Sequence, residues 1–169
     1  MGYVNNTQMS QFISPNLCAF SAGTWTPTLA SNVFSMNRTA ADAAFNVFAP
    51  ILTPGNAAAL AGAKLLSIEV CYSIGTAAAD DFATVELEKM TLPASGTAVS
   101  GAAVGITIDS GHDTAAERKA AGDHTMTITL NSPAYIDNND GYVLVLNIDA
   151  AATTVFKLYG VVVNFELRV

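Results

Sequence analysis

The sequence is poor in charge. Asp, Glu, Lys and Arg make up 12% of its 169 residues, whereas 51% are hydrophobic. An ordinary soluble domain carries about 25% charged residues. A surface with so little charge predicts that part of it is covered by neighbouring subunits, so we expect the chain to form an oligomer or a lattice.

The sequence also lacks any excess of positive charge and any long apolar run. Seven basic residues stand against 14 acidic ones, giving a net charge of -7, so we expect no nucleic-acid partner. No segment approaches the ~20 apolar residues of a membrane helix, so we expect no membrane partner. Residues 1–8 show neither the basic start nor the apolar stretch of a secretion leader, which predicts assembly inside a cell.

Cysteine is scarce as well. Cys18 and Cys71 are the only two, and with His112 and His124 they show none of the spacings of a metal site. Both cysteines lie in apolar or strand-like segments, so we favour two buried free thiols. A disulfide between them is an alternative, and a metal site is the least favoured. We expect no cofactor and no metal.

The C-terminal region, residues 142–169, carries the strongest structural pattern. Residues 142–149 are mostly aliphatic at both alternating sets of positions, as in a strand buried on both faces. Residues 161–169 alternate strictly between apolar and mostly polar side chains, which is the period of a strand and not of a helix. The second arm as a whole is residues 155–169. Because the linker at 150–154 between the two arms is only a few residues long, the pattern predicts an antiparallel hairpin at the heart of a sheet.

Further strands are predicted along the chain. Alternation indicates strands at 66–74, 82–92 and 124–130, and a looser one, containing two glycines, at 98–109. Thr114 and Glu117 form a capping-box pattern that predicts one short loop helix near 114–121. With seven to nine strands and no long amphipathic helix, the fold class is all-β: an antiparallel β-sandwich of jelly-roll or Greek-key type.

The first 16 residues differ from the rest. They are polar with isolated apolar positions, and Pro15 lies close to their end. Such a segment builds no core by itself, so we interpret 1–16 as an N-terminal arm that lies on another subunit, or as a disordered tail. Residues 17–169 are then a single β-sandwich domain.

Acidic loops offer candidate cation ligands. Residues 137–141, Asp-Asn-Asn-Asp-Gly, begin like a calcium loop, but Gly141 stands at the fifth position and Ile148 at the twelfth, where ligands are needed. A simple turn is the favoured interpretation. An oxygen-ligand site remains open if this loop shares one end of the sandwich with Asp80 and Asp81.

Residues 109–113, with Asp123 and His124, contain every residue type of a hydroxyl nucleophile, its base and an orienting acid. However, Ser110 lacks the Gly-x-Ser-x-Gly elbow. We therefore expect His112 and His124 to be solvated loop residues.

Glu86 and Glu88 lie two residues apart on the polar side of a predicted strand, a spacing compatible with glycosidase carboxylates. Lone acids on an outward strand face are more often simply solvated. We assign no catalytic, cofactor-binding or metal-binding residues and expect the chain not to be an enzyme.

Three segments resemble small β-sandwich structural proteins of tailed-phage virions, such as head-decoration, head-fibre and tail-associated subunits. The segments are Ala-Gly-Thr-Trp-Thr-Pro-Thr at 22–28, Tyr-Ser-Ile-Gly-Thr-Ala-Ala at 72–78 and Leu-Tyr-Gly-Val-Val-Val-Asn-Phe at 158–165. The resemblance implies a non-enzymatic subunit that self-associates, as a trimer or an array, with other virion proteins as partners. The implied location is the virion, assembled in the host cytoplasm.

Two alternatives remain open. One is a subunit of an extracellular filament or sheath, in which residues 1–16 add a strand to the next subunit. The other is a carbohydrate- or cation-binding β-sandwich module that uses the acidic loops at 137–141 and 80–81.

Overall fold

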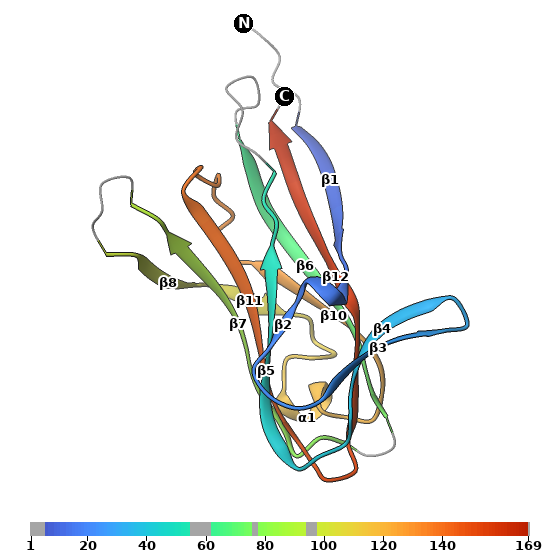
Figure 1. Ribbon diagram of the computed structural model, residues 1–169. Coiled ribbons are helices and arrows are strands. Elements are labelled where there is room, and N and C mark those ends of the chain that lie inside the picture. Colours follow the sequence, from blue (N-terminus) through green and yellow to red (C-terminus); the bar gives the residue numbers. More distant parts are fainter. Residues whose placement is uncertain (1–5, 55–61, 76–77, 94–97, 169) are drawn as a thin grey trace, which may run out of the picture.

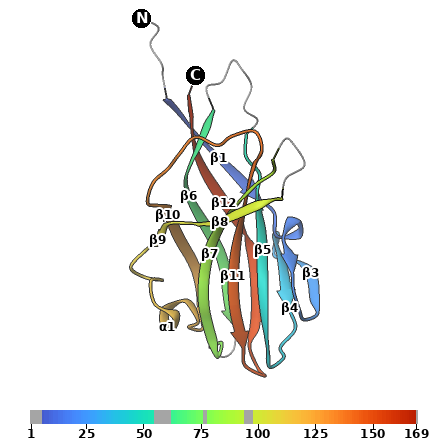
Figure 2. The ribbon, with the colours of Figure 1, turned by 90° about the vertical axis from the view of Figure 1, so that its left-hand side faces the viewer.

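The computed structural model describes residues 6–54, 62–75, 78–93 and 98–168. Two antiparallel β-sheets lie face to face, and both chain ends lie at one end of the molecule (Figure 1; Figure 2). The predicted fold class, an antiparallel β-sandwich, is confirmed.

The first sheet, sheet A, has the strand order β3-β4-β12-β6-β10-β9, and β1 pairs with β12 beyond the end of β4. Its strands are β1 (Asn6–Ile13), β3 (Trp25–Ala30), β4 (Val33–Arg38), β6 (Ala63–Gly75), β9 (Ile106–Ile108), β10 (Gly122–Leu130) and β12 (Val155–Arg168).

The second sheet, sheet B, has the strand order β2-β5-β11-β7-β8. Its strands are β2 (Ala19–Phe20), β5 (Ala43–Ile51), β7 (Asp81–Thr91), β8 (Ser100–Val104) and β11 (Asp140–Ala150). One 3-10 turn, η1 (Pro15–Leu17), and one short helix, α1 (Ala115–Arg118), complete the described elements.

The strands at 66–74, 82–92 and 124–130 follow the predicted alternation. In β6, Ile68, Val70 and Tyr72 are buried between the sheets, while Ser67 and Glu69 point outward. Alternate side chains of a strand point to opposite faces, so one apolar row per strand suffices to build the core.

The predicted hairpin of the two C-terminal arms is wrong. The arms are β11 and β12, and they lie in different sheets: β11 between β5 and β7, and β12 between β4 and β6. The short link between them turns at Ala151–Thr154 and crosses from one sheet to the other, held by a hydrogen bond from Thr154 Oγ1 to the Ala78 carbonyl oxygen. Alternation determines which face a side chain occupies but not which strand lies next to it.

The single strand predicted at 98–109 is two strands. The chain leaves sheet B after β8 and enters sheet A as β9, with Gly105 between them. Glycine tolerates the sharp bend that such a crossing needs.

The predicted loop helix is present but shorter, one turn at Ala115–Arg118. Its capping box is confirmed: Glu117 N donates to Thr114 Oγ1, and Thr114 N donates to the Glu117 carboxylate. We call residues 109–121 the α1 loop.

Arg118 gives this loop a structural role. The Arg118 side chain is buried, and its guanidinium donates hydrogen bonds to the carbonyl oxygens of Phe82, Ala83, His112 and Asp113. Since a buried guanidinium is stable only when its donors are satisfied, Arg118 fastens the α1 loop to β7.

The N-terminal segment lies on its own chain. Asn6–Ile13 forms β1, which pairs with β12 from Asn6↔Arg168 to Ile13↔Val161, and Ile13 is fully buried. Residues 1–5 of the proposed arm lie outside the described residues. Within one chain, therefore, residues 6–13 act as a strand of the sandwich, and the boundary at residue 16 stays a prediction.

Both cysteines are free. Cys18 is buried as expected, and burial raises its pKa to about 11. Cys71 instead points outward from β6 and is half-buried beside Thr125. Among the described residues, no helix has the length and apolar character needed to cross a membrane.

Candidate ligand-binding face

The two sheets present different outer surfaces, which we call face A (sheet A) and face B (sheet B). Face A carries small hydrogen-bonding side chains across neighbouring strands. Lys157, Ser73 and Asp123 lie opposite one another in register on β12, β6 and β10. Further along the same strands, Asn164, Ser67 and Thr129 repeat the pattern.

A β-bulge interrupts β12 in the middle of face A. Leu158 pairs with Tyr72 and Gly160 with Cys71, so Tyr159 is the extra residue. Gly160 has φ 147°, and a Cβ there would lie 2.5 Å from the Phe12 ring. The ring therefore lies directly on the glycine backbone, and Phe12 is 62% exposed.

A hollow of about 390 Å³ lies beside this bulge, between β12 and the β3–β4 hairpin. Figure 1 shows this hairpin projecting away from the body of the sandwich. Its turn residues, Ser31 and Asn32, have φ of 50° and 68°, as the tight two-residue turn of a hairpin requires. The hollow is lined by Thr28, Ala30, Val33, Ser35, Asn37, Asp123, Lys157 and Tyr159.

Polar side chains of the hollow hold one another in place. Ser35 Oγ donates to Asn37 Oδ1 at 2.8 Å, and Asn37 Nδ2 donates to Thr28 Oγ1 at 3.1 Å. This chain fixes the orientation of the Asn37 amide. Lys157 and Asp123 place one charge of each sign at the hollow, so it has no net charge.

A second polar group lies farther along β12. Asn164 accepts a hydrogen bond from Ser10 Oγ at 2.6 Å and donates to Ser67 Oγ and Glu69 Oε1 at 3.1 and 3.2 Å. It borders a second hollow of about 320 Å³. Face A therefore presents two hollows along one strand, with the Phe12 ring over the strand between Tyr159 and Asn164.

The acidic turn at 137–141 is occupied by the protein's own groups. The Asp140 carboxylate is 2% exposed and accepts from Lys89 Nζ at 2.7 Å, Thr91 Oγ1 at 2.7 Å and the Asp137 amide at 3.3 Å. Burial alone would raise the pKa of Asp140, but these hydrogen bonds outweigh it and hold the pKa below its usual value. The favoured interpretation, a turn, agrees with this arrangement.

The two acidic loops do not share an end of the sandwich. Asp81 begins β7, whereas Asp140 pairs with Thr91 at the end of that strand. At ~3.3 Å per residue the two loops lie roughly 30 Å apart, so they cannot form one cation site. Within the described ranges, no three His, Cys, Asp or Glu side chains gather as a metal-binding group.

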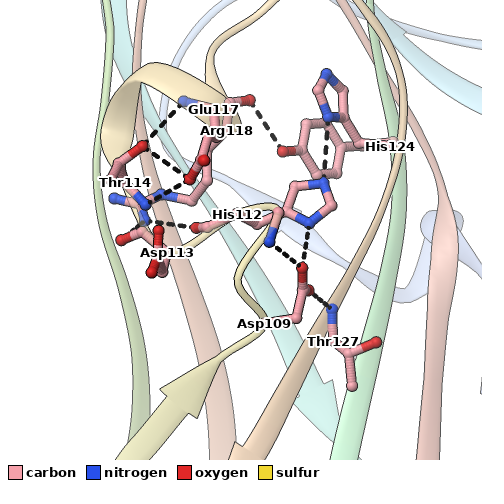
Figure 3. Close-up of polar contacts among 10 residues, drawn as sticks. Asp109, His112, Asp113, Thr114, Glu117, Arg118, His124 and Thr127 are labelled. Carbon is pink, nitrogen blue, oxygen red and sulfur yellow. Dashed lines mark hydrogen bonds and ion pairs between the residues drawn. The ribbon is translucent and has the colours of Figure 1, made fainter.

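His112 and His124 are hydrogen-bonded, not simply solvated as expected (Figure 3). His112 contacts Asp109 and His124 through its two ring nitrogens, and His124 Nε2 contacts the Ala120 carbonyl oxygen. All four ring nitrogens are in use, so neither ring is free to act as the base for Ser110. Asp109, His112 and His124 are thus joined to one another and do not form a catalytic triad with Ser110.

Glu86 and Glu88 lie on face B, opposite Val145 and Val143 of β11. Glu86 is exposed and Glu88 half-buried. They share an outward strand face, which agrees with the interpretation of solvated surface acids.

No protein-family model and no curated protein matches the chain. Among solved structures, TmCBM61 in complex with β-1,4-galactotriose is 8% identical, with 92% of this chain and 86% of that chain covered and a TM-score of 0.39. A second structure comes from work on the structural basis for the promiscuous specificity of carbohydrate-binding modules from the β-sandwich superfamily. It is 12% identical, with 92% of this chain and 55% of that chain covered and a TM-score of 0.42. The family 11 carbohydrate-binding module from Clostridium thermocellum, in complex with a β-1,3-1,4-mixed-linked tetrasaccharide, is 10% identical, with 96% and 89% covered and a TM-score of 0.35. At these TM-scores the likeness is one of general architecture and identifies no ligand for this chain.

The central residues of face A, Phe12, Tyr159 and Gly160, were not among the candidates from the sequence. One signal was present: a glycine inside the strand pattern at 155–169 indicates a bulge or a close approach of another group. Phe12 had no comparable signal, because its position depends on β1 pairing with a strand about 150 residues away.

Proposed function

We propose that this chain is a non-catalytic carbohydrate-binding module whose ligand lies on face A. The observation that carries the proposal is the exposed Phe12 ring packed on Gly160, together with the neighbouring residue Tyr159, which lines a hollow that also carries hydroxyl and amide groups.

The chemistry of face A suits a sugar. A sugar ring has an apolar C–H face and an edge of hydroxyl groups, so it needs a flat apolar surface next to donors and acceptors. Phe12 and Tyr159 offer the apolar surface, and Thr28, Ser35 and Asn37 offer neutral hydrogen-bonding groups. Because Lys157 and Asp123 balance in charge, the fitting class is a neutral saccharide.

A titration calorimetry panel of neutral soluble oligosaccharides, of mixed linkage and three to six units long, tests the proposal. At least one should bind, and Tyr159→Ala and Phe12→Ala should each weaken binding by about tenfold, the size of one lost aromatic contact. Met90→Ala, which removes an exposed side chain of sheet B, is the matched control and should bind like the wild type. Lack of binding across the panel, or wild-type affinity in both aromatic variants, would overturn the proposal.

Face B favours a second candidate function, self-assembly as a structural subunit. Its outward side chains on β5 and β11 are largely apolar and half-buried: Phe48, Pro50, Val143 and Val145. With only 12% charged residues in the chain, such a strip suits contact with a second copy. A virion location and virion partners stay predictions from the resemblance given above.

Light scattering of the purified chain tests this second candidate. We expect a trimer or larger particle that Val145→Asp, on face B, converts to smaller species. Thr129→Asp adds the same charge to an exposed position of face A and should leave the mass unchanged. A monomeric wild type would remove self-assembly and leave saccharide binding untouched, so the two candidates fail independently.

A further inference from the structure

Four imidazole nitrogens lie in one hydrogen-bonded line beside the α1 loop (Figure 3). Asp109 Oδ1 is 2.9 Å from His112 Nδ1, His112 Nε2 is 3.3 Å from His124 Nδ1, and His124 Nε2 is 2.9 Å from the Ala120 carbonyl oxygen. The line therefore runs from a carboxylate to a carbonyl through both rings.

Both ends of this line are acceptors. A carbonyl oxygen has no proton to donate, so His124 Nε2 must carry one. The Asp109 carboxylate also accepts from the amides of Gly111 and Thr127, at 3.0 and 2.6 Å, as an ionised group does. Burial alone would raise the pKa of Asp109, but the hydrogen bonds from His112 and these amides hold it below its usual value. His112 Nδ1 must then carry a proton as well.

The middle contact needs one proton more. With His112 Nδ1 and His124 Nε2 both protonated, two neutral rings would direct their remaining lone pairs at each other across 3.3 Å. A third proton, on either His112 Nε2 or His124 Nδ1, turns this contact into a hydrogen bond. Among the described residues, no three His, Cys, Asp or Glu side chains are placed together to hold a metal ion, so a proton and not a metal ion fits this contact.

We propose that His112 and His124 together form a one-proton site, and that the occupancy of this site controls how firmly the α1 loop is held. With one shared proton the line is complete. With none, the central contact becomes repulsive. With two, both rings are cations 3.3 Å apart, and the central hydrogen bond is lost.

The surroundings of the pair are mixed in charge. Tyr72 of β6 stacks on His124 with ring centroids 4.7 Å apart, and burial raises the pKa of Tyr72, so it stays a neutral phenol. The charged groups of the α1 loop and of β10 are Asp109, Asp113, Glu117, Arg118, Lys119 and Asp123; β7, which packs against the loop, begins at Asp81, and β6 carries Glu69 and Lys64 farther along the strand. Of these groups, only the Asp109 carboxylate is hydrogen-bonded to the imidazole rings of the pair. Its single negative charge balances one positive charge on the two rings but not two.

Nitrogen-15 NMR of the two imidazole rings across pH 4–9 tests the proposal. We expect two separate protonation steps, with a plateau in which His112 Nδ1 and His124 Nε2 are fully protonated and the facing nitrogens share one proton. His124→Phe keeps an aromatic ring on Tyr72 and removes the partner nitrogens, so His112 should then titrate in one step. Independent one-step titration of both rings in the wild type, or a neutral His124 protonated on Nδ1, would overturn the proposal.

Amide hydrogen exchange in the α1 loop gives the second readout. After correction for intrinsic rates, exchange at 115–120 should be about tenfold faster at pH 5 than on the plateau, the effect of two unit charges at this separation in a water-like dielectric. In His124→Phe this acid-specific increase should disappear. An increase of equal size in that variant would mean that another group opens the loop, and the proposal would fail.

Discussion

Faces A and B are the outer surfaces of two similar antiparallel sheets, but the side chains that point outward differ in kind. On face A, outward side chains hydrogen-bond along and across strands, as in the line Ser35, Asn37 and Thr28. On face B, the centre of the surface is aliphatic, with Val143 and Val145 of β11 in the middle. An alternating strand fixes only its inner face, so the two outer faces were free to diverge.

This difference separates two roles in one small domain. The oriented donors and acceptors and the exposed Phe12 ring of face A suit a soluble ligand, because water can take the ligand's place when it dissociates. An aliphatic strip gains nothing from such a ligand and is stabilised only by permanent cover. Sugar binding on face A and subunit contact on face B are therefore compatible proposals.

The largest expected effect on stability comes from comparing one glycine of each sheet. Gly160→Ala on face A combines a φ of 147° with a Cβ 2.5 Å from the Phe12 ring and 3.0 Å from the Ile13 carbonyl oxygen. We expect it to lower the free energy of unfolding by about 3 kcal/mol and to displace Phe12. Urea denaturation measures the first effect and saccharide affinity the second.

The control is Gly141→Ala in sheet B, where a Cβ would meet no atom within 4 Å. Its stability should change by less than about 1 kcal/mol. Equal losses in both variants would mean that the Phe12 contact does not anchor face A.

The buried Asp140 carboxylate tests whether the stability of sheet B depends on an ion pair that is not part of face B. Asp140→Asn removes the charge that accepts from Lys89 and Thr91 and should cost about 2 kcal/mol at pH 7. Because the folded-state pKa of Asp140 is lowered, its contribution is complete above the ordinary aspartate range and is lost as pH falls below about 4. Denaturation at pH 7 and pH 3 should therefore show the difference shrinking in acid.

Glu86→Gln, at an exposed position of face B, is the matched control and should change stability by no more than about 0.5 kcal/mol at either pH. A pH-independent loss in Asp140→Asn would assign the effect to packing and not to charge.

A pair of asparagines gives the smallest effect. Asn164→Ala breaks the hydrogen bonds that join Ser10, Ser67 and Glu69 on face A and should cost about 1 kcal/mol. Asn147→Ala, at an exposed position of face B, should stay within about 0.5 kcal/mol. If Asn147→Ala costs as much, the polar network of face A has no special weight.

The sequence allowed the fold class to be predicted, but not the neighbours of each strand. Alternation in β6, β7 and β10 assigned their inner faces correctly. The same pattern could not show that β11 and β12 lie in different sheets, because a four-residue link can close a hairpin or cross between layers equally well. The outward aliphatic side chains of β11 indicated burial on both faces, whereas Val143 and Val145 are only half-buried in the single chain.

The candidate sites depended even more on distant pairings. The sequence placed Arg118 in a short loop helix, and only the position of β7 shows that its guanidinium bonds to the Phe82 and Ala83 carbonyl oxygens. His112 and His124 were found as residues of interest, but their direct contact follows from the path of the α1 loop. Face A could not be assembled from the sequence, because Phe12 reaches Gly160 only through the pairing of β1 with β12.

The central positions of β11 and β12 also bear on how this protein is made. Each closes one sheet by inserting between strands formed much earlier in the chain, β5 and β7 for one and β4 and β6 for the other. Until the last 30 or so residues leave the ribosome, each sheet is therefore divided into separate pieces whose edges at the missing central strand are open. Folding by such distant pairings is slow, and open edges invite pairing with other nascent chains. The strand order itself therefore sets how long the unfinished chain stays open to such pairing: until β11 and β12 are released.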